Sequence, residues 1–220
     1  MKVDMVQSNQ LTETEIIQRI KRGEKALYEI IVRRFNPHLY RVARSYGYNH
    51  QDAQDLMQET FIDAYKSLSQ FANRAHFKTW MIRIMMNNCY RKKEKSSFKN
   101  EVMQEIPDHS TPLFARADND TDRIVRNHEL GRMIETALVN IPLDYRMVFS
   151  LREINGLNVA ETAEVLQISK VNVKVRLTRA KAMLRREIER TYTPSELFEF
   201  NLIHCDAMVE KVMEQTERLA

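Results

Sequence analysis

The residues best suited to bind another molecule lie between positions 71 and 95, where cationic and aromatic side chains alternate. Seven Lys or Arg stand against Glu94 alone in residues 74–95, and the rings among them are Phe71, Phe77, Trp80 and Tyr90. Cations follow phosphates, and aromatic rings stack on exposed bases. The stretch therefore predicts contact with single-stranded nucleic acid.

The segment just before this stretch has the opposite charge. Its apolar residues are spaced by four, three and four positions and form one stripe of a helix: Met57, Phe61, Ala64 and Leu68. Off that stripe lie the acidic residues Asp52, Asp55, Glu59 and Asp63. An acidic face followed by a basic one predicts two partners, a protein and a nucleic acid. The alternative is that the rings belong to a core and the charges to a solvated face.

Composition predicts an all-α protein. The 220 residues contain only 4 Gly and 5 Pro, too few for the many turns of a β architecture. The net charge of +4 matters less for nucleic-acid binding than its clustering. Cys89 and Cys205 are far apart, the first ten residues hold no apolar core segment, and no apolar run approaches a membrane span. We therefore expect a cytoplasmic location.

Helix signals divide the first hundred residues into four segments. Thr12 and Glu15 form a capping-box pattern, which predicts a helix to about Arg22. A second helix is expected over residues 25–45 despite Pro37, then the acidic helix, a short loop at residues 73–75, and the basic helix. Four such helices can close a bundle with its own core.

A second helical domain is expected after a linker. Prolines and polar residues break the periodicity over residues 96–127, which we interpret as a flexible linker. Helices are expected from His128 to before Pro142 and over residues 145–153. Asn158 with Glu161 then predicts a helix over 159–166, and Ser169 can cap a longer one to about Arg190.

Those last two helices match the helix-turn-helix plan, in which the second helix enters a major groove. Eight Lys or Arg stand against two Glu from Lys170 to Arg190. The expected buried set of the unit is Ala163, Leu166, Ile168, Val173, Leu177, Ala180 and Leu184. The tail, residues 191–220, contains an amphipathic stripe fit to pack on this domain or to bind a regulator; the sequence leaves both open.

Two runs of residues resemble a known family. The first is Asp55-x-x-Gln58-Glu59-x-Phe61, followed by Phe71, Phe77-x-Thr79-Trp80-x-x-x-Ile84 and Asn87. It resembles region two of bacterial RNA polymerase sigma factors, most closely the extracytoplasmic-function (ECF) group. The second is Ile141-Pro142-Leu143, Leu151-Arg152-Glu153, Gly156-Leu157 and Val173-Lys174-x-Arg176-Leu177-x-Arg179-Ala180, which is similar to region four of the same group.

The resemblance implies domain boundaries and roles. Region two would cover residues 10–95 and region four residues 128–190. Core RNA polymerase would be bound by Asp55, Gln58, Glu59 and Phe61. The melted strand of the downstream promoter element would be held by Phe71, Asn73, Arg74, Ala75, Trp80, Arg83 and Asn87. The upstream element would be held by Ser169, Lys170, Lys174, Val175, Arg176 and Arg179. An anti-sigma factor is a further partner the resemblance allows.

Two departures and two alternatives accompany the resemblance. Gln167 stands where a turn glycine is common, and Val175 where some members carry a hydroxyl residue, so upstream specificity can differ.

The alternatives are a stand-alone helix-turn-helix regulator and a sigma mimic that binds only a regulator. No catalytic constellation, glycine-rich phosphate loop or zinc spacing occurs, so neither enzymatic activity nor a cofactor or metal is expected.

Overall fold

The computed structural model describes residues 11–72, 75–98 and 131–191, and all the regular structure within these ranges is helical. The N-terminal helices are α2 (Glu13–Lys21), the short 3₁₀ helix η1 (Lys25–Leu27), α3 (Tyr28–Tyr46), α4 (His50–Ser67), the 3₁₀ helix η2 (Leu68–Gln70) and α5 (Phe77–Phe98). The C-terminal ones are a helix over 131–139, α7 (Leu143–Phe149), η3 (Ser150–Ile154, a π-helical turn), α8 (Val159–Leu166) and α9 (Lys170–Thr191). An all-α fold is confirmed.

The predicted capping signals lie at the starts of the helices. Thr12 Oγ1 accepts a hydrogen bond from the Glu15 amide at 3.3 Å, and Glu15 Oε2 accepts one from the Thr12 amide at 2.8 Å. Asn158 and Glu161 repeat this reciprocal pair at α8, with distances of 2.9 and 2.7 Å. Each pair satisfies backbone donors that have no partner within the helix. Both capping boxes predicted from the sequence are therefore confirmed.

Helix α3 contains Pro37 in its interior and still continues to Tyr46. The predicted segment of residues 25–45 differs at its start, where the first three residues form η1, and by one residue at its end. Gly47 ends α3 with φ of 108°, a left-handed conformation that glycine adopts without a steric penalty. The chain then re-enters a helix at once, because Asn49 Oδ1 accepts from the Asp52 amide at 2.8 Å.

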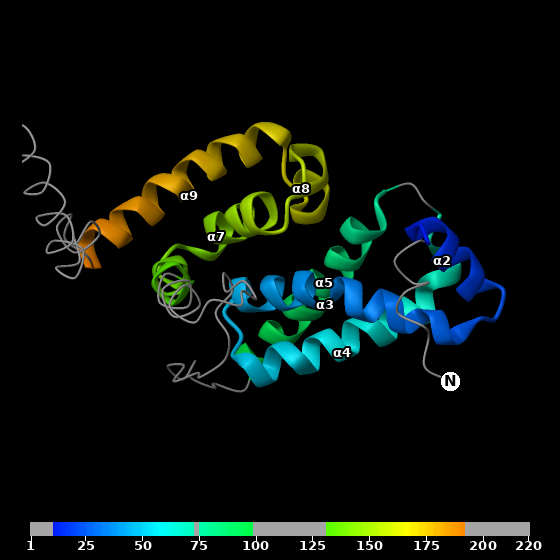
Figure 1. The fold of residues 1–220 in the computed structure, drawn as a ribbon. Helices are drawn as coiled ribbons and strands as arrows, with labels where there is room; N and C mark the ends of the chain where they lie inside the picture. The colour runs from blue at the N-terminus through cyan, green and yellow to red at the C-terminus, as the bar shows by residue number, and fades with distance from the viewer. Residues whose placement is uncertain (1–10, 73–74, 99–130, 192–220) are drawn as a thin grey trace, which may run out of the picture. The chain divides into compact units, whose positions relative to one another are not determined.

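Helices α3, α4 and α5 lie side by side and contact one another pairwise (Figure 1). Their fully buried side chains include Ile31, Leu39, Leu56, Met81 and Ile82. Phe61 and Ala64 of α4 are buried, as is Leu68 at the start of η2 directly after it, and Met57 is partly buried. The predicted apolar stripe is therefore the face that α4 turns to the core, and the opposite face stays exposed.

Helix α5 continues to Phe98, two residues beyond the predicted start of the linker at Ser96. Residues 96–98 contain no proline or glycine, so nothing in them ends the helix. The remainder of the predicted linker and of the predicted tail, apart from Thr191, lies outside the described residues, as does the start of the helix expected from His128.

The C-terminal helices form the predicted helix-turn-helix. Gln167 turns the chain between α8 and α9 in a left-handed conformation, with φ of 54° and ψ of 42°. Ser169 Oγ then accepts from the Asn172 amide at 3.1 Å and opens α9. Val173 and Ala180 on α9 are fully buried, and Leu177 packs against the cluster that contains Val173. From Arg185 onward α9 belongs to a second compact unit, in which Arg185 Nε donates to Glu189 at 2.7 Å.

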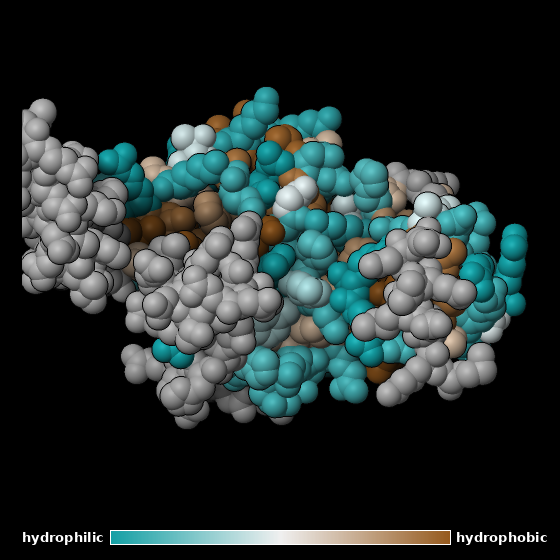
Figure 2. All heavy atoms as spheres, viewed as in Figure 1, coloured by the Kyte–Doolittle hydropathy of each residue, from teal (hydrophilic) through white to brown (hydrophobic). Residues whose placement is uncertain are grey.

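Within residues 1–184 the two sets of helices share one hydrophobic core. Met147, Leu151 and Leu157 are buried in the same cluster as the residues of α2–α5. Two polar contacts accompany this packing: Ser150 Oγ donates to Ser45 Oγ at 2.7 Å, and Arg44 donates to Glu135. The described surface seen in Figure 2 is mostly hydrophilic. No helix in the described part of the chain is long and apolar enough to cross a membrane.

Candidate polymerase and promoter interfaces

The exposed face of α4 carries three of the four residues assigned to polymerase binding. Asp55, Gln58 and Glu59 are exposed, whereas Phe61 is only 7% exposed and its ring belongs to the core. The carbonyl of Phe61 accepts a hydrogen bond from Tyr28 Oη at 2.6 Å. Phe61 therefore packs α4 against the core, and a partner would contact the polar residues around it.

Two apolar residues share this face of α4. Ile62 is 48% exposed and Tyr65 36% exposed. They follow Gln58 by four and seven positions, so all three lie on one side of the helix. Sequence reasoning missed both residues, although they are large apolar side chains outside the core stripe, which was the available signal. The face combines acidic, amide and apolar groups.

Part of the basic stretch pairs with α4. Arg91 Nη2 lies 3.4 Å from Asp63 and 3.7 Å from Glu59, and Lys92 pairs with Asp52. The change of charge sign between the two helices thus serves in part to join α4 to α5. Of the four acidic residues off the apolar stripe, Asp55 and Glu59 are exposed, whereas Asp52 and Asp63 are half-buried.

The aromatic residues at the start of α5 form a cluster. Phe71 and Phe77 are buried at 6% and 2% exposure, and their ring centroids lie 5.0 Å apart. Trp80 is half-buried with its ring 5.1 Å from that of Phe71. Phe71 therefore has no free face to offer a base, and Trp80 is the ring nearest to solvent. Ala75 is half-buried, while Asn73 and Arg74 lie outside the described residues.

Acidic groups of α8 lie against the basic face of α5. Arg83 Nη1 is 3.4 Å from Glu164, and Thr79 Oγ1 donates to Glu161 at 3.1 Å. Lys78 Nζ donates to the carbonyl of Asn155, and burial lowers the pKa of this lysine, although Glu161 opposes that shift. Two side chains that a phosphate would otherwise attract are thus engaged within the chain.

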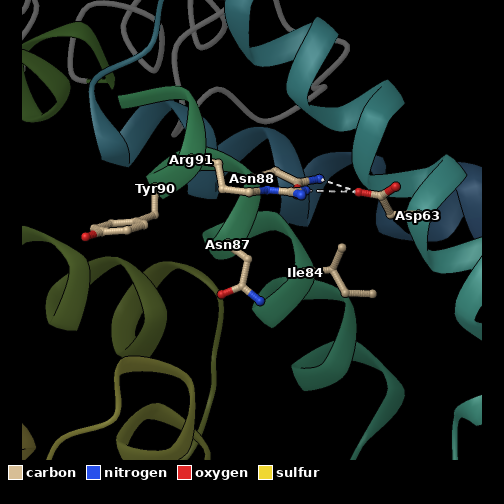
Figure 3. Close-up of a pocket in the computed structure, with 6 residues that line it drawn as sticks. All are labelled: Asp63, Ile84, Asn87, Asn88, Tyr90 and Arg91. Atoms are coloured by element: carbon tan, nitrogen blue, oxygen red, sulfur yellow. Dashed lines mark hydrogen bonds and ion pairs between the residues drawn. The ribbon is translucent and has the colours of Figure 1, made fainter. Parts of the chain in front are cut away.

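A pocket of about 360 Å³ lies between α4 and the middle of α5 (Figure 3). Asp63 accepts from Asn88 Nδ2 at 3.2 Å and from Arg91 at one wall. The amide of Asn87, predicted to read a base, points away from that group, and Tyr90 is 56% exposed beside it. Sequence reasoning assigned only Asn87; Tyr90 and Arg91 join it because they lie three and four positions further along one helix.

The residues assigned to the upstream element lie at the start of α9. Ser169, Lys170, Lys174, Val175 and Arg179 are exposed. Arg176 differs, because its side chain is 29% exposed and lies 3.3 Å from Asp144 of α7. Thus α9 presents cations on its outer side, while Arg176 is held toward the domain.

Comparison with known proteins identifies both sets of helices. Residues 31–98 match the family model described as Sigma-70 region 2, and residues 131–184 match Sigma-70, region 4. The chain is 26% identical over 186 residues to the ECF RNA polymerase sigma-E factor of Haemophilus influenzae, covering 83% of this chain and 98% of that one. It is 25% identical over 181 residues to the RNA polymerase sigma-H factor of Pseudomonas aeruginosa, covering 80% and 94%.

Solved structures share the fold. CnrH, in complex with the cytosolic domain of CnrY, is 21% identical with a TM-score of 0.57, covering 80% of this chain and 97% of that one. RpoE of Bartonella quintana, in complex with the anti-sigma factor NepR, has the same identity and TM-score and covers 70% and 91%. The two family matches together span more than half of the chain and occur in the predicted order. The chain therefore belongs to the ECF group of sigma-70 factors, and it is an alternative sigma factor that binds core RNA polymerase and directs promoter recognition, melting and transcription initiation.

Proposed function

We propose that three separate faces divide this work, and that α4 provides the one that binds polymerase. The supporting observation is the exposed side of α4, where Gln58, Ile62 and Tyr65 lie beside Asp55 and Glu59. Partly exposed apolar groups surrounded by polar ones are typical of a protein interface. Because the opposite side of α4 is in the core, this face can be altered without unfolding the bundle.

Replacing Gln58 and Glu59 together by alanine tests the polymerase face. We expect weaker binding to core polymerase in competition with the housekeeping sigma factor, with helicity unchanged by circular dichroism. Gln18→Ala, at an exposed position of α2, is the matched control and is expected to bind as the wild type does. Equal affinity of the double variant and the wild type would remove these residues from the interface.

The proposal assigns the downstream promoter element to the pocket on α5. Asn87 can hydrogen-bond the edge of an unpaired base, and the exposed Tyr90 ring can stack, while Arg91 stays paired with Asp63 and Glu59 at the wall of the pocket. Ala75, Trp80 and Arg83 are assigned to the same promoter element, as are Asn73 and Arg74, which lie outside the described residues. Because the ring of Phe71 is itself buried, we assign Phe71 the role of holding the Trp80 ring in position.

Promoter melting tests the pocket. Asn87→Ala is expected to reduce permanganate reactivity of thymines in the melted region while leaving polymerase binding intact. Tyr90→Leu keeps an apolar side chain but removes the aromatic ring, so we expect weaker capture of the single strand by one stacking interaction, about 1–3 kcal/mol. Normal melting by both variants would show that the single strand does not bind in this pocket.

The proposal assigns the upstream element to the exposed start of α9. Lys170 and Lys174 are placed to meet phosphates and Arg179 to reach base edges in the major groove. Loss of one base contact costs about 1–3 kcal/mol, so Arg179→Ala should weaken holoenzyme binding to duplex carrying the upstream element. An unchanged affinity in a gel-shift series would reject this assignment.

These assignments require the contact between α8 and α5 to open. Arg83 cannot hold a phosphate fully while Glu164 neutralises it, and Thr79 is engaged by Glu161. We therefore assign the packed arrangement to the sigma factor before it engages the promoter. An anti-sigma factor that keeps the chain in this form is a partner consistent with the RpoE–NepR complex of Bartonella quintana.

We propose that the chain acts in the cytoplasm, where the polymerase and the chromosome are. It binds both of them, and core polymerase carries out RNA synthesis. Reconstitution tests it as a whole: the purified chain added to core polymerase should start transcripts at discrete sites of bacterial genomic DNA. Specific duplex binding without polymerase, and no transcripts with it, would instead favour the stand-alone regulator.

A further inference from the structure

Two valines on the outer side of α9 are exposed. Val171 is 68% and Val175 42% exposed, among only six large apolar residues so exposed in the described part of the chain. They are four positions apart in the first two turns and therefore lie on one side of the helix. Val173, on the opposite side, is fully buried. The core of the domain is complete without the two outer valines.

Helix stability does not account for these residues. Branching at Cβ restricts the side chain in a helix, so valine is a poorer helix former than alanine, lysine or glutamate. The exposed part of each valine also leaves apolar surface in water. The two positions thus cost the free protein a little stability, and a contact made only in a complex would offset that cost.

The neighbours of the valines suit DNA. Lys170 and Lys174 are exposed on the same turns. Thr178 follows one turn later, and its hydroxyl donates to the Lys174 carbonyl at 3.1 Å, which leaves its methyl group as the part free to meet a partner. This side of α9 therefore offers cations for phosphates and a row of methyl groups between them.

In the major groove, only thymine presents an apolar group, its 5-methyl. We infer that Val171 and Val175 read thymine 5-methyl groups in the upstream promoter element. The inference rests on the proposed placement of α9 in the major groove and deepens it by naming the bases. It predicts at least one A·T pair under each of the first two turns of α9, with the thymine methyl directed to the protein.

Replacing thymine by deoxyuridine tests this contact, because it removes the methyl group and changes nothing else on the base edge. The upstream element is first obtained by selecting a randomised duplex with the holoenzyme. Each thymine of the selected site is then replaced singly, and affinity is measured with the wild-type holoenzyme. One lost methyl contact should weaken binding about fourfold at the contacted positions.

Valine-to-alanine variants show which residue contacts each thymine methyl group. With Val175→Ala, thymine and deoxyuridine should bind equally at one position and still differ at the position read by Val171; Val171→Ala should give the reverse. Alanine is a better helix former, so neither variant should unfold the domain. Val139→Ala is the matched control, because Val139 is 46% exposed on another helix, and it should keep the full thymine preference at both positions.

Other outcomes overturn the inference. A selected upstream element without thymine, or equal binding of thymine and deoxyuridine at every position by the wild type, excludes methyl reading. If Lys174→Ala and Arg179→Ala still weaken binding in that case, α9 remains the recognition helix and only the valine assignment fails. If those two variants also bind normally, the placement of α9 in the groove fails, and the inference fails with it.

Discussion

Glu135 accepts hydrogen bonds from two nitrogens of Arg44 through a single oxygen, at 2.9 Å from Nε and 2.7 Å from Nη2. The side chains are only 7% and 14% exposed. Arg44 lies on α3 in region two, and Glu135 lies on the helix over 131–139 in region four. A buried ion pair thus connects the two regions.

We predict that Glu135→Ala is strongly destabilising. The substitution leaves the buried Arg44 guanidinium without its carboxylate partner, with the Tyr48 carbonyl still 3.3 Å from Nη1, and breaking a buried pair in this way costs about 3–5 kcal/mol. Urea unfolding followed by circular dichroism measures the loss. Glu135→Gln keeps an acceptor and should lose less, and Arg44→Met with Glu135→Leu should recover much of the stability. A loss below about 1 kcal/mol for Glu135→Ala, the value of an exposed pair, would contradict the prediction.

A disulfide in place of the Ser45–Ser150 contact tests whether the packed arrangement of regions two and four must open. Both serines are buried and their hydroxyl oxygens are 2.7 Å apart. Replacing both by cysteine should allow a disulfide, because the two side chains are within the required reach. Oxidised protein should fail to start transcription, and reductant should restore it, since the proposed function requires region four to leave region two.

The controls for this lock are the two single cysteine variants, each in a Cys205→Ser background. Cys89 does not compete for the disulfide, because it is fully buried and burial raises its pKa to about 12, so the thiolate that exchange requires is scarce at neutral pH. Oxidant should leave the single variants active. Full activity of the disulfide-linked protein would show that initiation does not need the contact to open.

Local features of this fold were predictable from sequence. The capping boxes at Thr12 and Asn158 involve residues three positions apart, and the stripe from Met57 to Leu68 follows helical spacing, so each signal is local in the sequence. The helix-turn-helix was found for the same reason. The placement of Gln58 and Glu59 on an exposed face followed from the stripe on the other side.

Contacts between distant helices were not predictable in this way. The sequence shows Arg91 as one of a run of cations, but its pairing with Asp63 depends on how α4 packs on α5. Phe71 has the residue type of a base-stacking ring, yet packing with Phe77 buries it. Glu164 is 81 positions from Arg83, and nothing in the spacing of either connects them.

The turn of the helix-turn-helix gives a stability prediction. Gln167 is the one non-glycine residue with positive φ among those the structure describes. A side chain in the left-handed region costs about 1–2 kcal/mol, which glycine avoids, although glycine loses more entropy on folding. Gln167→Gly should therefore raise the free energy of unfolding by up to about 1 kcal/mol. Gln167→Ala keeps the Cβ and should give no gain; equal gains in thermal melts would show that the conformation is not strained.

His38 makes stability depend on pH. Its Nδ1 lies 3.4 Å from Asn155 Oδ1, and burial lowers its pKa, with Lys78 and Arg41 adding to the shift while the Asn155 hydrogen bond opposes it. The unfolded chain protonates this histidine near pH 6.5, and the folded chain only at lower pH. Below about pH 6.5 the unfolded state therefore binds more protons, so the free energy of unfolding should fall as pH falls toward the folded pKa.

The difference between wild type and His38→Gln isolates this contribution. Other groups titrate in both proteins and largely cancel, including Glu13, whose pKa is raised by burial and which acts in the opposite direction. Urea unfolding at pH steps from about 7.5 to 5.5 should show a smaller decrease for His38→Gln than for the wild type. Parallel curves for the wild type and His38→Gln would mean that His38 titrates equally in the folded and unfolded chain.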